Sequence, residues 1–139
     1  MKFISNNEKE TQGVAMEFSK TLRGGEVILM YGDLGAGKTV FAKALAKALG
    51  VKEIVKSPTF NLMKRYKGEK LSLCHIDAYR LKNFDELLDI GADEYIGKLG
   101  VVTVIEWAER VADLKSKKII KIKIEHGKEN NERMIEINS

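Results

Sequence analysis

The sequence predicts an α/β fold in which helices flank one mixed sheet of parallel and antiparallel strands. Glu26–Tyr31 is an apolar run of the kind found in strands buried on both faces. Lys38–Leu49 follows it with a helical pattern rich in Ala, Leu and Lys, and Gly50 stops that helix. Ile119–Glu125 alternates Ile with Lys or Glu, which is typical of a half-exposed strand. Strands that alternate with helices, together with hairpins, indicate a mixed α/β sheet.

The other elements are predicted from caps, spacing and turns. Ser5 and Glu8 resemble a capping box that begins a first helix, which ends at Gly24-Gly25. Further along the chain, the pattern predicts a hairpin of strands Thr59–Tyr66 and Leu71–Tyr79, a short helix Asn83–Ile90, a buried strand Val101–Ile105, and a strand Met134–Ile137 that pairs with Ile119–Glu125.

Length and composition indicate a single globular domain over residues 1–139. The chain is 44% hydrophobic and 32% charged, which is ordinary for a folded protein and argues against disorder. The apolar runs are short, so we expect no membrane span, and the first residues lack a secretory pattern. The single cysteine, Cys74, suits a reducing cytoplasm. A net charge of +4 permits a polyanionic ligand without requiring nucleic acid.

The segment Gly32–Thr39, with sequence GDLGAGKT, matches the phosphate-loop pattern G-x-x-x-x-G-K-[ST] in full. It lies between the predicted buried strand and the predicted helix, which is the setting that this motif requires. The predicted fold is therefore that of a P-loop NTPase. The alternative, a glycine-rich turn with an incidental lysine, explains neither the full match nor its setting.

The residue types of this loop suit phosphate chemistry. Gly32, Gly35 and Gly37 allow the backbone to curl so that its amides point at an anion. The helix that begins near Lys38 adds its positive N-terminal dipole, and Lys38 adds a charge for the β- and γ-phosphates. Thr39 offers a hydroxyl to Mg²⁺.

Two carboxylates are candidates to complete the site. Glu106 ends the apolar strand VVTVIE, a Walker B pattern that places it at the carboxyl edge of a parallel sheet, where ligands bind. Asp77 shares a strand face with His75 and Tyr79, and this face is either a cleft wall beside the phosphates or a solvated face. An exposed strand end is the alternative for Glu106. We expect His75 to be a hydrogen-bonding partner rather than a metal ligand.

Several other residues have more than one interpretation. Ser57-Pro58-Thr59 is either a switch loop that senses the γ-phosphate or a plain turn, which the sequence alone slightly favours. We expect Trp107 to be a packed core or edge aromatic rather than a base-stacking residue. We expect Arg80 and Arg110 to lie on the surface rather than to stabilise charge in the site. The chain has no Asn/Thr-Lys-x-Asp segment, so ATP is favoured over GTP.

The motifs GDLGAGKT, SPTF, HIDAYR and VIEW, taken in order, resemble the TsaE family (also called YjeE), small P-loop ATPases of bacterial tRNA threonylcarbamoyladenosine synthesis. The similarity extends from about Thr11 to the C-terminal strands. It implies slow ATP hydrolysis that depends on two partner proteins, TsaD and TsaB, which modify adenosine 37 of tRNAs reading codons that start with A. The ATPase would contact tRNA only indirectly or through that complex, and it would reset the complex between turnovers.

The resemblance also assigns roles to residues of this chain. It implies that Gly35, Ala36, Gly37, Lys38 and Thr39 bind phosphates, that Thr39 and Glu106 bind Mg²⁺, that Asp77, Glu106 and Lys38 are catalytic, and that Ser57, Pro58 and Thr59 form the switch loop. Thr11 matches a threonine near the nucleotide base, and Arg133 lies where a C-terminal residue closes on the nucleotide. Val40, grouped with the nucleotide-binding residues, stands where a second hydroxyl residue is frequent.

Two other function classes stay open from the sequence. One is an independent small-molecule kinase, which would phosphorylate an acceptor without protein partners. The other is a nucleotide-responsive binding module in which hydrolysis is incidental.

Overall fold

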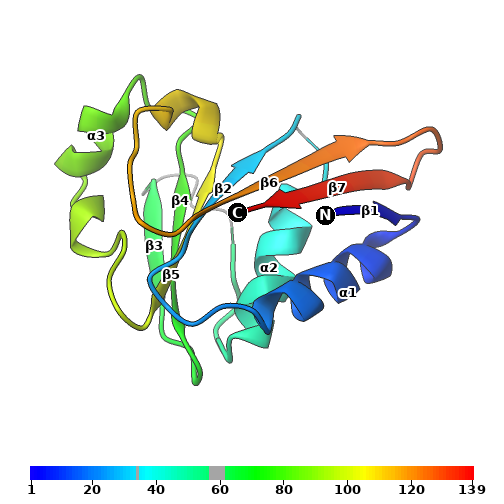
Figure 1. The fold of residues 1–139 in the computed structure, drawn as a ribbon, viewed down its shortest axis with the longest axis horizontal. Coiled ribbons are helices and arrows are strands. Elements are labelled where there is room, and N and C mark those ends of the chain that lie inside the picture. The colour runs from blue at the N-terminus through cyan, green and yellow to red at the C-terminus, as the bar shows by residue number, and fades with distance from the viewer. Residues whose placement is uncertain (34, 57–61) are drawn as a thin grey trace.

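A computed structural model describes residues 1–33, 35–56 and 62–139, and across these ranges it contains one seven-stranded sheet with helices on both faces (Figure 1). The spatial order of the strands is β1-β7-β6-β2-β5-β4-β3. The elements in chain order are β1 (Lys2–Ser5), α1 (Glu8–Ser19), β2 (Val27–Tyr31), α2 (Lys38–Ala48), β3 (Met63–Tyr66), β4 (Ser72–Asp77), α3 (Phe84–Asp89), the short 3₁₀ helix η1 (Ala92–Glu94), β5 (Val101–Glu106), a second 3₁₀ helix η2 (Ala108–Val111), β6 (Ile119–His126) and β7 (Arg133–Asn138).

The centre of the sheet is parallel and its margins are antiparallel. β2 pairs in parallel with both β5 and β6, and β4 pairs in parallel with β5. β3, β7 and β1 add antiparallel pairs at the two sides. The predicted mixed sheet and the β3–β4 hairpin are therefore confirmed. Because the central strands are parallel, the carboxyl ends of β2, β5 and β4 lie at the same edge of the sheet.

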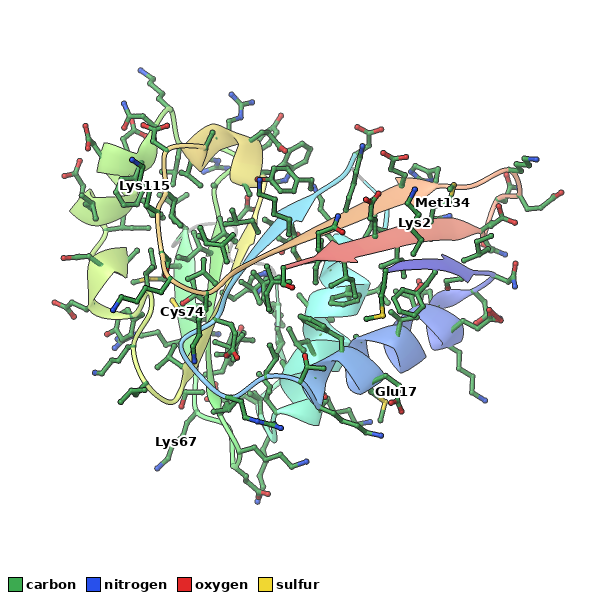
Figure 2. All side chains as sticks on the ribbon, viewed as in Figure 1. Lys2, Glu17, Lys67, Cys74, Lys115 and Met134 are labelled. Carbon is green, nitrogen blue, oxygen red and sulfur yellow. The ribbon has the colours of Figure 1, made fainter. Side chains whose placement is uncertain are left out.

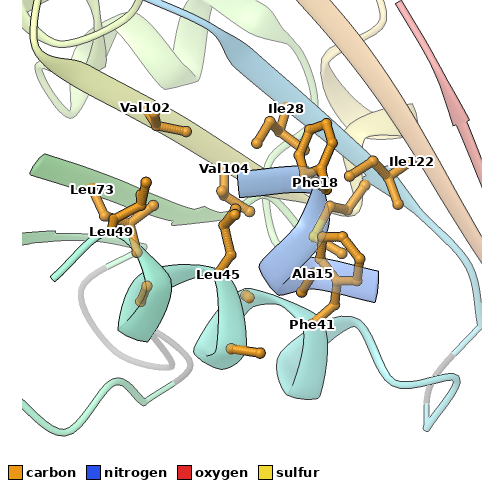
Figure 3. Packing of buried hydrophobic residues seen from close by; sticks show 14 of the residues in the cluster. Ala15, Phe18, Ile28, Phe41, Leu45, Leu49, Leu73, Val102, Val104 and Ile122 are labelled. Carbon is orange, nitrogen blue, oxygen red and sulfur yellow. The ribbon is translucent and has the colours of Figure 1, made fainter. Parts of the chain in front are cut away.

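One face of the sheet is covered by α1 and α2 (Figure 3). Phe18 of α1 and Phe41 of α2 lie with ring centroids 6.2 Å apart, and Leu45 packs in the same cluster beneath the strands. Val104 and Ile122 contribute to this cluster from the sheet, and both are completely buried. Burying one such side chain contributes about 1.5–3 kcal/mol, so this layer fixes α2, and with it the loop that precedes α2, against the sheet.

The opposite face of β2, β4 and β5 packs against α3, η1 and η2. Leu29, Cys74 and Ile105 of the strands form a second cluster with Leu87 and Ala108 of the helical segments. Figure 2 shows Cys74 inside the molecule, while Glu17 and Lys67 lie at its periphery. The alternation along β4 therefore sends Cys74 to one core and His75 to the other face of the sheet.

The N-terminal region differs from the prediction. The capping box of Ser5 with Glu8 is wrong, because Ser5 is the last residue of a strand, β1, that pairs with β7. The helix is capped instead by Asn7, whose side chain accepts a hydrogen bond of 2.8 Å from the Glu10 amide. The Ser5 hydroxyl is buried and lies 2.7 Å from that of Thr11. Four residues are too few for the sequence to distinguish a strand from the segment that precedes a helix. The strand is defined by its pairing with β7.

The remaining boundaries shift by a few residues. β4 ends at Asp77, so Tyr79, expected on the same strand face as Asp77, lies beyond the strand and is 54% exposed. β3 begins at Met63, and residues 59–61 of the predicted strand lie outside the described residues. Within the described part of the chain, no helix has the length and apolar character needed to cross a membrane.

Candidate functional site

The predicted phosphate loop leaves the end of β2 and enters α2, as the motif requires. Gly32 has φ +142°, and a Cβ atom at this position would lie 2.2 Å from the Ile124 carbonyl oxygen. Gly37 has φ +105° and is the N-cap of α2, but it offers no side chain to cap the helix. Glycine is therefore required at position 32 on steric grounds, and the first turn of α2 faces the loop without a side-chain cap.

Lys38 is held inside the site by two kinds of contact. Only 5% of its surface is exposed, and its Nζ donates a hydrogen bond of 2.6 Å to the Gly32 carbonyl. The same Nζ lies 3.5 Å from the centroid of the Trp107 ring, which is a cation–π distance. Burial lowers the pKa of Lys38 below its ordinary value, and nearby carboxylates, above all Glu106, oppose that change. Within the described ranges, the ammonium group forms no ion pair with a carboxylate.

Asp77 and Glu106 lie side by side at the edge of the sheet where the loop begins. They are paired residues in the parallel register of β4 and β5, and Met30 of β2 pairs with Glu106 on its other side. Asp77 is half-buried, and its Oδ1 accepts a hydrogen bond of 3.0 Å from the Tyr79 amide. Glu106 is buried, and its Oε2 lies 2.5 Å from His75 Nε2. His75 is therefore the hydrogen-bonding partner that the sequence indicated.

A cavity of about 480 Å³ lies in front of these groups. Its lining brings together residues from α1, the loop, the strand edge and the β6–β7 turn: Asn7, Glu8, Thr11, Gly35, Gly37, Lys38, Thr39, Val40, Asp77, Glu106, Trp107, Asn131 and Arg133. Most of the sequence-predicted site residues are among them. Ala36 is a fully buried residue of the loop and is not in this lining, and Gly32 faces a second, more open hollow of about 800 Å³. The predicted switch residues Ser57, Pro58 and Thr59 lie outside the described residues.

Arg133 of β7 and Thr11 of α1 also line the cavity. Arg133, the first residue of β7, donates from Nε to the Ala36 carbonyl at 3.1 Å and from Nη2 to the Gly35 carbonyl at 3.4 Å. Thr11 is buried on α1, and its hydroxyl is engaged with Ser5. Both residues therefore line the cavity although they lie far from the loop in the sequence.

Sequence reasoning missed some of the lining. Asn7 and Glu8 reach the cavity because β1 sets the start of α1 beside it, and Asn131 reaches it through the β6–β7 turn. These placements depend on strand pairing between residues distant in the chain, so no local sequence pattern predicts them. Trp107 is a half-buried aromatic at the sheet edge, as expected, with its ring centroid 5.0 Å from that of Tyr79. Its contact with Lys38 was not expected.

The side chains in the cavity suit a magnesium ion that arrives with a nucleotide. Thr39, Asp77 and Glu106 all line the cavity and offer hard oxygen donors, which Mg²⁺ prefers. Among the described residues, no three or more His, Cys, Asp or Glu side chains are grouped so that they could hold a metal. Mg²⁺ commonly binds through one or two carboxylates together with water and substrate phosphates, and the donor set here fits that mode.

The sheet order, the strand–loop–helix unit and the cavity define the class of this molecule: an α/β protein with a P-loop type of fold. The family follows from comparison with known proteins. Residues 5–135 match the family model of the threonylcarbamoyl adenosine biosynthesis protein TsaE, and the chain belongs to this family.

Individual relatives agree with that assignment. The chain is 48% identical over 109 residues to the tRNA threonylcarbamoyladenosine biosynthesis protein TsaE of Aquifex aeolicus, covering 77% of this chain and 76% of that protein. It is 43% identical over 112 residues to the TsaE protein of Treponema pallidum, covering 81% and 82%. The crystal structure of YdiB from Bacillus subtilis superposes with a TM-score of 0.81 at 33% identity, covering 97% of this chain and 82% of that chain.

Proposed function

We propose that this protein is the ATPase of tRNA threonylcarbamoyladenosine biosynthesis, which binds ATP with Mg²⁺ in the 480 Å³ cavity and hydrolyses it slowly. One observation carries the proposal. Lys38, Asp77 and Glu106 come from α2, β4 and β5, and they line one cavity at the mouth of the glycine-rich loop. A cation for the phosphates and two carboxylates at the same mouth are the parts that phosphoryl transfer needs.

The phosphate-binding part of the proposal rests on the loop and on Lys38. The uncapped first turn of α2 provides amide donors and a positive dipole end. Lys38 Nζ now donates to a neutral carbonyl and lies over an aromatic ring. A phosphate oxygen would offer it a charged acceptor, and a charge-assisted hydrogen bond is roughly twice as strong as a neutral one. We therefore expect Lys38 to exchange these contacts for the β- and γ-phosphates.

The hydrolytic part rests on the two carboxylates. Thr39 and Glu106 would hold Mg²⁺, which when bound neutralises charge on the phosphates. Asp77, half-buried beside Glu106, would orient the attacking water as a hydrogen-bond acceptor. Arg133 donates to the Ala36 and Gly35 carbonyls and so would help to hold the loop in its curled conformation.

The biological part rests on family membership. The TsaE family acts in threonylcarbamoyladenosine biosynthesis, and we assign this chain the role of resetting a TsaB–TsaD complex that modifies adenosine 37 of tRNAs reading codons that start with A. It would contact tRNA only through that complex and would work in the cytoplasm. We propose that the slow hydrolysis of the isolated chain is stimulated by these partners.

The test combines a pull-down with a turnover assay. The purified chain, with and without ATP, is offered to TsaB and TsaD, and ATP hydrolysis is measured alone and with the pair. Nucleotide-sensitive capture and stimulated hydrolysis are expected. Phosphorylation of a small acceptor without the partners would indicate a kinase instead. Partner function that survives loss of hydrolysis would indicate a binding module.

A further inference from the structure

The contact between His75 and Glu106 is a buried polar contact at the edge of the site. Neither the phosphate-loop motif nor the resemblance assigns a role to His75. It is 0% exposed, Glu106 is 4% exposed, and His75 Nε2 lies 2.5 Å from Glu106 Oε2. A polar pair is placed in such an interior only when its geometry compensates for the loss of hydration.

The strand register explains how the contact forms. Asp77 pairs with Glu106, and His75 lies two residues earlier on the same face of β4. The Glu106 side chain therefore leans back along the sheet to reach His75, rather than pointing straight toward Asp77. Oε2 accepts this hydrogen bond, and Oε1 is the carboxylate oxygen that has no contact with His75.

The imidazole has one partnered and one unpartnered nitrogen. His75 Nδ1 is buried and has no hydrogen-bond partner among the described residues. A carboxylate only accepts hydrogen bonds, so Nε2 carries the hydrogen that is donated to Oε2. The ring thus acts as a donor aimed at Glu106.

We propose that His75 is a positioning residue that fixes the Glu106 carboxylate in the orientation required for the Mg²⁺–nucleotide complex. The inference rests on the proposed function, in which Glu106 binds Mg²⁺. Groups that orient a ligand carboxylate from behind commonly change metal affinity or activity by 10–100-fold when they are removed. A merely structural pair would instead tolerate an apolar replacement of similar volume.

Two substitutions separate positioning from packing. His75→Gln keeps an amide nitrogen near the place of Nε2, so the donor to Glu106 survives. His75→Leu fills the volume without a donor. Thr103→Val is a matched control, because Thr103 lies on β5, is 0% exposed and has no side-chain hydrogen-bond partner within the described ranges, yet it faces the opposite core from Glu106.

The measurement is the affinity for a non-hydrolysable ATP analogue by calorimetry, with Mg²⁺ and with EDTA. In EDTA, all four proteins are expected to bind within about twofold of one another. With Mg²⁺, His75→Leu is expected to lose about 10-fold or more of the gain in affinity that the ion gives the wild type. His75→Gln should recover most of that gain, and Thr103→Val should keep it. Hydrolysis should follow the same order.

Some outcomes overturn the inference directly. One such outcome is a His75→Leu variant that keeps the full Mg²⁺-dependent gain in affinity for the ATP analogue. Another is an equal loss of that gain in His75→Leu and His75→Gln, when both variants unfold at the same temperature as the wild type. If His75→Leu does not fold, His75→Asn replaces it, because its shorter amide cannot reach Glu106; Asn and Gln variants that behave alike would also contradict the proposal. A wild type that hydrolyses no ATP, alone or with partners, would overturn the proposed function, while the calorimetric comparison still decides the role of His75.

Discussion

The Nζ of Lys38 lies 3.5 Å from the ring centroid of Trp107 while it donates a 2.6 Å hydrogen bond to the Gly32 carbonyl. Trp107 reaches this position because it follows the end of β5 with φ +58°, an uncommon conformation for a large side chain. The site therefore holds the lysine proposed to bind phosphate against an aromatic face. In the proposed function, Lys38 leaves this contact when a triphosphate binds.

Trp107 should report that event, because it is the only tryptophan of the chain. We expect a saturable change in its emission, excited at 295 nm, when ATP is added, since the ammonium group leaves the ring. A Lys38→Met variant serves as the control and should show no such change at the same ATP concentrations. An emission that is unaltered while calorimetry shows ATP bound would contradict the predicted exchange of contacts.

Removing the Lys38 charge should weaken nucleotide binding. Lys38→Ala is expected to raise the dissociation constant for ATP by roughly 10–100-fold, because a charge-assisted hydrogen bond contributes about 1.5–3 kcal/mol. Equilibrium dialysis with labelled ATP measures this directly. Lys43→Ala, in the same helix but outside the cavity lining, is the matched control and should bind like the wild type. Unchanged affinity in Lys38→Ala would remove Lys38 from the phosphate site.

The steric demand at Gly32 predicts a loss of stability. Gly32→Ala would place Cβ 2.2 Å from the Ile124 carbonyl oxygen, so the loop or β6 has to move. Together with the positive φ, this should cost more than about 1–2 kcal/mol of unfolding free energy. Urea unfolding measures the difference. Gly13→Ala, in the middle of α1 with no atom near its Cβ position, should instead stabilise by about 0.5–1 kcal/mol. Equal behaviour of the two variants would contradict the packing described.

The thiol of Cys74 should be unreactive in the folded protein. Burial raises the pKa of Cys74 from 9.0 to about 12, so at pH 8 only about one thiol in ten thousand is ionised. Ellman's reagent should react far more slowly with native protein than with protein in urea. The pKa of Cys74 is higher in the folded protein than in the unfolded chain, so folding favours the protonated thiol. The contribution of this thiol to the free energy of unfolding is therefore complete below pH 9 and is lost as the pH rises toward 12. Fast native labelling without loss of structure would contradict the burial.

Asp77 should be needed for repeated rounds of tRNA modification. Asp77→Ala removes the carboxylate beside Glu106 and should abolish multiple-turnover product in a reconstituted system. The first round should persist, because the proposed task of the ATPase is to reset the complex. Asp93→Ala, on η1 and away from the cavity lining, is the control. Multi-round product from Asp77→Ala at the wild-type level would remove Asp77 from the mechanism.

The parts of the site that the sequence predicted are those encoded locally. The loop between β2 and α2 is one contiguous motif, and Glu106 could be placed at its edge because a parallel strand that ends in a carboxylate meets the same edge. The alternation along β4 likewise separated His75 and Asp77 from Cys74. The alternation of residues along a strand and a contiguous motif are enough to predict side-chain placement where that placement depends on a few neighbouring residues.

The parts that were missed depend on residues distant in the chain. β1 pairs with β7, so the true start of α1 and the burial of Ser5 become visible only when both ends of the chain are placed together. The contact of Trp107 with Lys38 depends on a backbone turn after β5 that no residue preference indicates. Local pattern cannot encode these relationships, because either side chain alone fits several environments.

In the proposed function, this cavity binds a triphosphate and Glu106 acts in its hydrolysis. The most direct test is a paired measurement of ATP binding and single-turnover ATP hydrolysis in wild type and Glu106→Gln, each with TsaB and TsaD present. In EDTA, we expect Glu106→Gln to bind ATP within a few-fold of the wild type. With Mg²⁺, we expect its hydrolysis to fall about 100-fold or more, which corresponds to roughly 2.7 kcal/mol. Hydrolysis at the wild-type rate in Glu106→Gln would contradict the proposed function.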